Sequence, residues 1–173
     1  NGHRRHGGVN PGETVVIIGG GAIGLLHTAL NLTCGAGQVI LCEKHANRRD
    51  RAAAMGAVTT CPEHLSKVVA EHTGGHGAEL VIVAIGRNEL AEESLNLAAP
   101  GGRVSWFAGF PKGSTTTITP NTVHYQELTI SGGSNASRAD VHRAVDMLGR
   151  GNIDETPIVT HTFGLSQWTE ACL

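Results

Sequence analysis

Short runs of consecutive apolar residues recur along this chain, separated by longer stretches whose apolar residues have helical spacing. The runs are rich in β-branched residues and are bounded by glycine, proline or polar residues, which is typical of strands. They are apolar throughout rather than alternating, so we expect both faces of the sheet to be covered. The predicted strands span Thr14–Ile18, Gln38–Cys42, 57–60, 79–85, 103–108 and 127–131, with a last extended piece over 157–161.

Helices are predicted between these strands. Pro62 suits the first turn of one of them, because the first N–H groups of a helix have no acceptor within it. The repetition of strand and helix indicates parallel strands joined by right-handed crossovers. The expected fold class is therefore α/β, a doubly wound parallel sheet of six strands with helices on both faces. The predicted helices span 22–34, 46–55, 62–72, 90–98, 121–125, 138–148 and 165–173.

Length and composition narrow the class of protein. The chain has 173 residues, about one domain by the usual length of roughly 150 residues. Its 24 glycines follow no collagen-like period and indicate many turns and close backbone approaches. The net charge of -2 gives no reason to expect nucleic acid or an anionic membrane as a partner. No apolar run approaches the roughly 20 residues that a membrane-spanning helix needs.

The two ends of the chain and its cysteines suggest whether it is part of a longer protein and in which redox compartment it occurs. Residues 1–10 hold a basic cluster without the apolar stretch of a signal peptide, and the chain does not begin with Met. The run 165–173 has helical character but no capping glycine, so we expect a piece of a longer protein. The four cysteines form no C-x-x-C pair, which favours ordinary thiols in a reducing, cytoplasmic setting.

Residues 19–24 form a G-x-G-x-x-G pattern. It directly follows the predicted strand Thr14–Ile18 and opens the next helix, which is the context of a dinucleotide-binding turn. In such a turn the first glycine permits the bend, the second lets a pyrophosphate approach the backbone, and the third lets the helix lie close to the strand. The helix N-terminus adds N–H groups and partial positive charge. The predicted cofactor-binding residues here are Gly19, Gly20, Gly21, Ala22, Ile23 and Gly24.

Glu43 supplies the acidic residue that completes this pattern. It ends the strand Gln38–Cys42 and lies 19 residues after Gly24. A carboxylate there can accept both hydroxyls of an adenosine ribose, and it repels the 2′-phosphate of NADP. The turn is not a Walker loop, because no Lys-Ser or Lys-Thr follows the glycines. We therefore predict a Rossmann domain that binds NAD in preference to NADP.

Residues 15–26, VVIIGGGAIGLL, resemble the start of the cofactor domain in zinc-type medium-chain alcohol and polyol dehydrogenases. Further matches follow in the family's order and extend the resemblance over residues 11–173. Pro120-Asn121 and residues 127–130 make sorbitol and threonine dehydrogenases the most similar members. The other matching segments are 46–49, 55–57, 77–81, 84–86, 100–104 and 159–161.

This resemblance implies three further stretches around the cofactor, all at the carboxyl ends of predicted strands. The first lies beside the two riboses, and the second and third meet the carboxamide of the nicotinamide. Arg48 matches a basic position beside the adenosine ribose. The three stretches are Ala84, Ile85 and Gly86; Phe107, Ala108, Gly109 and Phe110; and Gly133, Ser134 and Asn135.

The resemblance also implies a catalytic domain that precedes this chain and carries the zinc ion and most of the substrate pocket. We therefore expect residues 1–13 to be a lead-in from that domain. Residues 14–161 are the expected dinucleotide-binding domain, and 162–173 the start of the return segment to the catalytic domain.

The histidines do not suggest a metal site within the chain. Ten are scattered along it, and neither close pair, His3 with His6 or His72 with His76, has further ligands at metal spacing. We predict no catalytic residue and no metal ligand here. The edge strand 127–131 is instead expected to pair two copies into a homodimer, as the resemblance also implies.

The leading hypothesis is the NAD-binding domain of a zinc-dependent dehydrogenase that transfers hydride between a secondary alcohol or polyol and NAD. Zinc is expected only in the missing domain, and the chain alone is expected to be inactive. Two alternatives stay open: a zinc-free reductase of the same superfamily, and a stand-alone NAD-binding module without chemistry. Cysteine and histidine ligands upstream of Asn1 favour the zinc enzyme, whereas a reading frame that starts near Asn1 favours the module.

Overall fold

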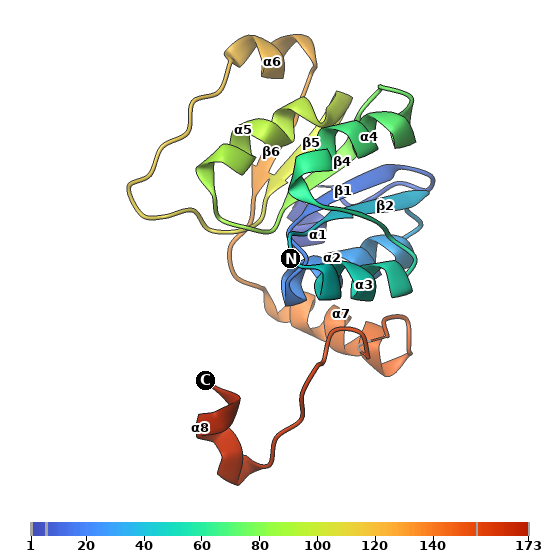
Figure 1. Ribbon diagram of the computed structural model, residues 1–173, viewed down its shortest axis with the longest axis vertical. Coiled ribbons are helices and arrows are strands. Elements are labelled where there is room, and N and C mark those ends of the chain that lie inside the picture. The colour runs from blue at the N-terminus through green and yellow to red at the C-terminus, as the bar shows by residue number, and fades with distance from the viewer. Residues whose placement is uncertain (1, 6, 155, 173) are drawn as a thin grey trace.

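The computed structural model describes residues 2–5, 7–154 and 156–172 (Figure 1). At its centre is a six-stranded sheet in which every pairing is parallel. The strand order is β3-β2-β1-β4-β5-β6, which confirms the doubly wound topology expected from the sequence. The strands are β1 (Thr14–Ile18), β2 (Gln38–Cys42), β3 (Val58–Thr60), β4 (Ala78–Val83), β5 (Ala98–Trp106) and β6 (Thr129–Gly132).

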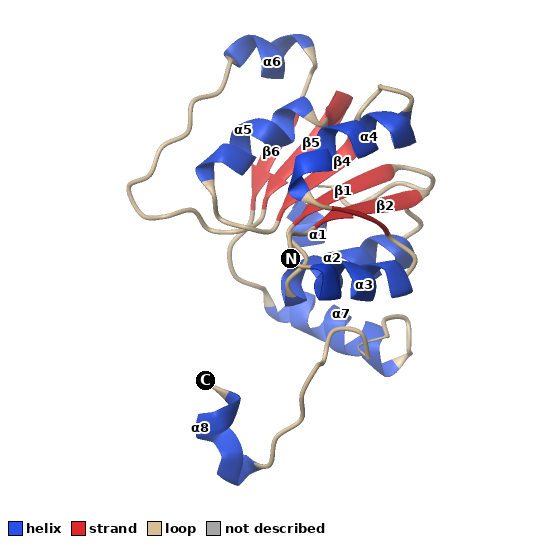
Figure 2. Ribbon diagram, viewed as in Figure 1, coloured by secondary structure: helices blue, strands red, loops and turns tan. Residues whose placement is uncertain are grey.

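Helices cover both faces of the sheet (Figure 2). One face carries α2 and α3, and the other carries α4 and α5. A segment with α8 extends away from the sheet at the C-terminal end (Figure 1). Over the described ranges, no helix has both the length and the apolar character needed to cross a membrane. The helices are α1 (Gly2–Arg5), α2 (Ala22–Thr33), α3 (Ala46–Ala54), α4 (Leu65–Thr73), α5 (Asn88–Asn96), α6 (Pro120–Tyr125), α7 (Arg138–Gly149) and α8 (Trp168–Ala171), with 3-10 turns at Pro62–His64 and Leu165–Gln167.

Alternate residues of the central strands fill two separate hydrophobic clusters. Val16 and Ile18 of β1 pack in the cluster under α4 and α5, whereas Val15 and Ile17 pack in the cluster under α2 and α3. All four side chains are buried. Because both faces of the strand are buried, both sets of positions must be apolar, which explains the continuous apolar runs in the sequence.

The fifth strand begins earlier than predicted. β5 starts at Ala98, not at residue 103, because Ala98 pairs with Ala78 of β4 before the ladder becomes irregular. Gly101, with a φ of 74°, lets the chain bend within this stretch. A strand interrupted by Pro-Gly-Gly carries no apolar pattern across the interruption, so the sequence showed only its second half.

Two other predicted segments differ from the structure in their bounds or their conformation. β6 spans Thr129–Gly132 rather than 127–131, because Glu127 has a φ of 52° and cannot be part of a strand. Residues 157–161 belong to no strand. They follow a turn in which the N–H of Thr156 donates to Oδ1 of Asp154 (2.9 Å), and Ile158 packs against the cluster under α2 and α3 instead.

The topology creates a crevice between β1 and β4. These two strands are neighbours, but the helices that follow them lie on opposite faces: α2 follows β1 and α5 follows β4. At such a switch point the two loops leave in opposite directions and open a crevice at the carboxyl ends of the strands, where ligands of doubly wound proteins bind. The predicted cofactor residues follow the carboxyl ends of five strands, β1, β2, β4, β5 and β6, with Arg48 further along in α3.

Candidate cofactor-binding site

The glycine turn between β1 and α2 is closed on one side and open on the other. Gly19 has a φ of 111°, and its N–H donates to the carbonyl of Cys42 (2.8 Å). A Cβ atom on Gly24 would overlap the carbonyl oxygen of Gly19, so this position has no room for a side chain. In contrast, nothing lies within 4 Å of the Cβ position of Gly21, the N-cap of α2. The open side is thus at a helix N-terminus, where anions are stabilised.

Glu43 connects the end of β2 to this turn. Its Oε2 accepts a hydrogen bond from the N–H of Gly20 (2.8 Å), and its Oε1 accepts one from the N–H of His45 (2.8 Å). Burial raises the pKa of this carboxyl, but the two N–H groups and the nearby Arg48 lower it more, so its pKa lies below the usual range. Each carboxylate oxygen has a second lone pair. The ionised, buried Glu43 can therefore still accept hydrogen bonds from a ligand.

Two basic residues lie beside Glu43. Nη1 of Arg48, the residue predicted from the resemblance, is 3.8 Å from Oε2 of Glu43, and its side chain is half exposed. Arg49 was not predicted. Its Nη1 donates to the carbonyls of both Glu43 and Lys44 (2.8 Å each), which fixes the loop after β2. The six-residue spacing between Glu43 and Arg49 could not reveal this contact, because the contact depends on the path of the loop.

The loop after β4 contacts both the glycine turn and the loop after β5. A Cβ atom on Gly19 would lie 2.6 Å from Cγ1 of Ile85, so the turn packs directly on the 84–86 stretch. A Cβ atom on Gly86 would overlap the carbonyl oxygen of Gly109. These close approaches require glycine and bring two of the stretches predicted from the resemblance into direct contact.

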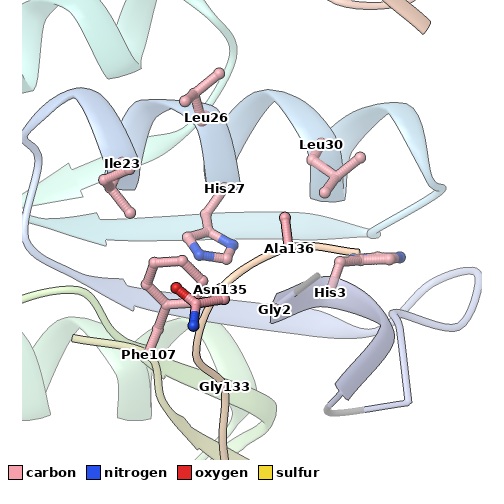
Figure 3. A pocket seen from close by; sticks show the side chains of 10 residues that line it. All are labelled: Gly2, His3, Ile23, Leu26, His27, Leu30, Phe107, Gly133, Asn135 and Ala136. Carbon is pink, nitrogen blue, oxygen red and sulfur yellow. The ribbon is translucent and has the colours of Figure 1, made fainter. Parts of the chain in front are cut away.

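An apolar pocket of about 460 Å³ lies beside α2. Three predicted segments meet in it: Ile23 from the glycine turn, Phe107 from the end of β5, and Gly133 with Asn135 from the end of β6 (Figure 3). The ring of His27 stands edge-on to that of Phe107, with ring centroids 4.5 Å apart. The pocket has the size and the mainly apolar lining that small-molecule sites usually have.

Sequence reasoning missed His27, although a pattern could have revealed it. His27 follows Ile23 by four residues, and residues at that spacing share one face of a helix. Four of the 18 predicted residues line the pocket, and the other fourteen, among them Glu43, Arg48 and Phe110, do not. Phe110 instead lines a separate hollow of about 150 Å³ under the loop that follows β5.

The described residues offer no ligand set for a metal ion. No group of three or more His, Cys, Asp or Glu side chains in this part of the chain could hold one. The zinc that the resemblance implies is expected in the preceding domain and not among these residues.

Residues 22–150 match the family model described as zinc-binding dehydrogenase. The chain belongs to this family. Over 161 residues it is 35% identical to L-threonine 3-dehydrogenase of Bacillus subtilis, a match that covers 91% of this chain and 46% of that protein. The chain thus spans about half the length of the curated relatives it matches.

Solved structures agree with the family and the fold. A protein described as a zinc-binding dehydrogenase from Sinorhizobium meliloti, bound to NADP, is 30% identical with a TM-score of 0.78, over 91% of this chain and 52% of that one. An alcohol dehydrogenase from E. coli complexed with NADH superposes with a TM-score of 0.83 at 22% identity, over 94% of this chain and 48% of that one. At 22% identity, the similarity to the E. coli protein shows a shared fold and no more. Both the Rossmann fold and the medium-chain dehydrogenase family expected from the sequence are confirmed.

Proposed function

We propose that this chain is the NAD-binding domain of a dehydrogenase that transfers hydride between a secondary alcohol or polyol and NAD. The observation that carries the proposal is that the glycine turn and Glu43 lie at the carboxyl ends of β1 and β2, and that residues following β5 and β6 line the apolar pocket beside the same helix, α2. The turn suits a pyrophosphate, Glu43 an adenosine ribose, and the pocket a nicotinamide ring.

In this proposal the adenosine and pyrophosphate end is held by the loops after β1 and β2. The backbone at the open side of Gly21 meets the pyrophosphate, and the N-terminus of α2 stabilises its charge. Glu43 accepts the ribose hydroxyls through its remaining lone pairs, and Arg48 lies beside it. Ala84, Ile85 and Gly86 support the riboses from the neighbouring loop.

The nicotinamide end is held by the loops after β5 and β6. Phe107 and Ile23 provide apolar contact, and the 107–110 and 133–135 stretches offer backbone groups to the carboxamide. The cofactor supplies the chemistry by accepting or donating a hydride at its nicotinamide ring. The chain's own part is to bind the ring, orient it, and keep water from one face.

Relatives support the cofactor and substrate classes. The S. meliloti relative holds NADP, which supports a nicotinamide dinucleotide. Glu43 favours NAD over NADP for this chain. The name of the B. subtilis relative, L-threonine 3-dehydrogenase, describes dehydrogenation of a secondary alcohol, which supports that substrate class.

The proposal extends to the whole protein. We propose that a zinc-bearing catalytic domain precedes residues 1–13, that residues 14–161 bind the cofactor, and that 162–173 lead back. The family description and the greater length of the relatives support this arrangement.

The free cysteines, of which Cys42 is buried, support a reducing, cytoplasmic setting.

The chain alone is expected to bind NADH weakly and to produce no NADH from NAD and alcohols. The binding segments are present, but an alcohol oxidation needs its developing alkoxide stabilised, which is the Lewis-acid role of zinc in this family. Calorimetry with NADH measures the first part, and a panel of alcohols and polyols with zinc added measures the second. Absence of any dinucleotide binding would overturn the proposal. Turnover that Gly21→Asp abolishes would place an active site within the chain and contradict the fragment interpretation.

A homodimer through the edge of β6 is also proposed. Leu128, within the segment 127–131 expected to pair, is buried in the core. The edge is therefore formed by the strand itself, in which Thr129 and Gly132 are exposed and Ile130 and Ser131 are half-buried. Thr129→Lys should place like charges at the pairing edge and yield a folded monomer. Sedimentation velocity distinguishes the two states. An unaltered chain that stays monomeric at high concentration contradicts the proposal.

A further inference from the structure

The structure points to a residue that positions the nicotinamide end of the site without lying in the pocket beside α2. We propose that Asn88, the first residue of α5, anchors the loop 107–119 and so fixes its 107–110 stretch for contact with the nicotinamide. This inference rests on the proposed function. It concerns a side chain that neither the glycine pattern nor the resemblance singled out.

Asn88 makes three hydrogen bonds to consecutive residues of the loop. Its Nδ2 donates to the carbonyl of Thr115 (2.9 Å), and its Oδ1 accepts from the hydroxyl of Ser114 (3.0 Å). Its own carbonyl accepts from the hydroxyl of Thr116 (3.2 Å). One side chain therefore engages both a donor and an acceptor of the loop, and the local backbone adds a third contact.

The loop needs such an anchor because little packs beneath its middle. A hollow of about 150 Å³ lies under it, lined by Asn88, Trp106 and Phe110 among others. The indole of Trp106 stands edge-on to the ring of Phe110, with centroids 6.0 Å apart.

The start of the loop is held by the N–H groups of Phe107 and Ala108, which donate to the carbonyl of Val83, and by the close approach of Gly109 to Gly86. Near its other end, Ile118 packs against the cluster under α4 and α5. The bonds from Asn88 hold the segment between these two contacts to the helix layer.

The anchor itself is rigid. α5 packs on the sheet through the buried Ala91 and Leu95, so Asn88 is held by the core of the domain. Its neighbour Glu89 is exposed and pairs with Arg87 (3.6 Å), also exposed, rather than with the loop. Glu89 therefore provides a matched control on the same turn of the same helix.

The test compares two ligands on the 173-residue chain. NADH reaches both ends of the proposed site, whereas ADP-ribose has the adenosine, pyrophosphate and ribose without the nicotinamide. Asn88→Ala removes the side-chain bonds to Ser114 and Thr115 and so releases the 107–110 stretch from its anchor. It should weaken NADH binding about tenfold in calorimetry and leave ADP-ribose binding unchanged, because ADP-ribose lacks the nicotinamide that this stretch contacts. Glu89→Ala should change neither. A double-mutant cycle with Ser114→Ala should be non-additive, since both changes break the same bond.

A spectroscopic readout reports the loop independently of ligand binding. In a Trp168→Phe background, Trp106 is the sole tryptophan, and Asn88→Ala should alter its emission while Glu89→Ala should not. An Asn88→Ala chain that binds NADH as tightly as the unaltered chain overturns the inference, as does an equal loss of NADH and ADP-ribose affinity. An unaltered chain that binds NADH no tighter than ADP-ribose also overturns it, because the loop then contributes nothing. If the unaltered chain binds neither ligand, the proposed function itself fails.

Discussion

Gly21→Ala is expected to leave the fold intact and to weaken NADH binding at least tenfold, whereas Gly24→Ala is expected to destabilise the fold itself. Nothing lies within 4 Å of the Cβ position of Gly21, and its φ of -69° suits any residue. A methyl group there costs the domain little, about 0.5 kcal/mol as a poorer N-cap. It fills the space into which the proposed pyrophosphate must come.

The methyl group of Gly24→Ala meets protein instead of ligand. It overlaps the carbonyl oxygen of Gly19, so α2 must move away from β1, at a cost of about 1–3 kcal/mol or more. Thermal melting followed by circular dichroism, with calorimetry using NADH, separates the two effects. A Gly21→Ala chain with full NADH affinity contradicts the assignment of the open side of the turn to the pyrophosphate. A Gly24→Ala chain of unchanged melting temperature contradicts the close packing of α2 on the sheet.

The parts of the fold that follow from local chemistry could be predicted from the sequence. The turn at Gly19 and Gly24 is one, because its glycines, the strand before it and the helix after it are adjacent in the chain. The position of Glu43 at the end of β2 is another, since the apolar run sets where the strand ends. The bounds of a strand cannot be predicted from its apolar residues where the backbone adopts an uncommon conformation. Glu127 is an example, because a positive φ is rare for glutamate.

Contacts between distant segments could not be predicted from residues alone. Asn88 and Ser114 are 26 residues apart, and nothing in either stretch indicates that one hydrogen-bonds to the other. The resemblance placed Gly86 and Gly109 in two separate cofactor stretches, but only the path of the two loops shows that they contact each other and that Gly86 has no room for a side chain. The resemblance supplied the stretches around the cofactor but not the side chains that support them, because support depends on the loops of this particular chain.

The second large effect concerns Glu43 and the choice of cofactor. The unaltered chain is expected to bind NADH more tightly than NADPH, because the 2′-phosphate of NADPH would meet the ionised carboxylate. Like charges about 4 Å apart repel by roughly 1 kcal/mol in water and about 4 kcal/mol at an effective dielectric constant of 20. That corresponds to roughly tenfold to thousandfold in affinity. Arg48, 3.8 Å from the carboxylate, and its neighbours reduce the preference.

Glu43→Gln should lower the ratio of NADH to NADPH affinity about tenfold or more by removing this charge. It should also destabilise the domain by about 1–3 kcal/mol, because an amide NH₂ then faces one of the two N–H donors, Gly20 or His45, that the carboxylate satisfies. Since the pKa of Glu43 is lowered in the folded chain, its contribution to stability is present at neutral pH and is lost as the pH falls through that pKa. The Gln variant should therefore lose less stability on acidification than the unaltered chain.

Titration of both chains with NADH and NADPH, and melting curves between neutral and acidic pH, measure these effects together. Glu71→Gln is the control, because Glu71 is an exposed carboxylate on α4 that pairs with Lys67 and should change neither the cofactor ratio nor the pH profile. Tighter binding of NADPH than NADH by the unaltered chain would contradict the NAD assignment. A Gln variant that keeps both the stability and its full pH dependence would show that Glu43 does not brace the glycine turn through the N–H of Gly20.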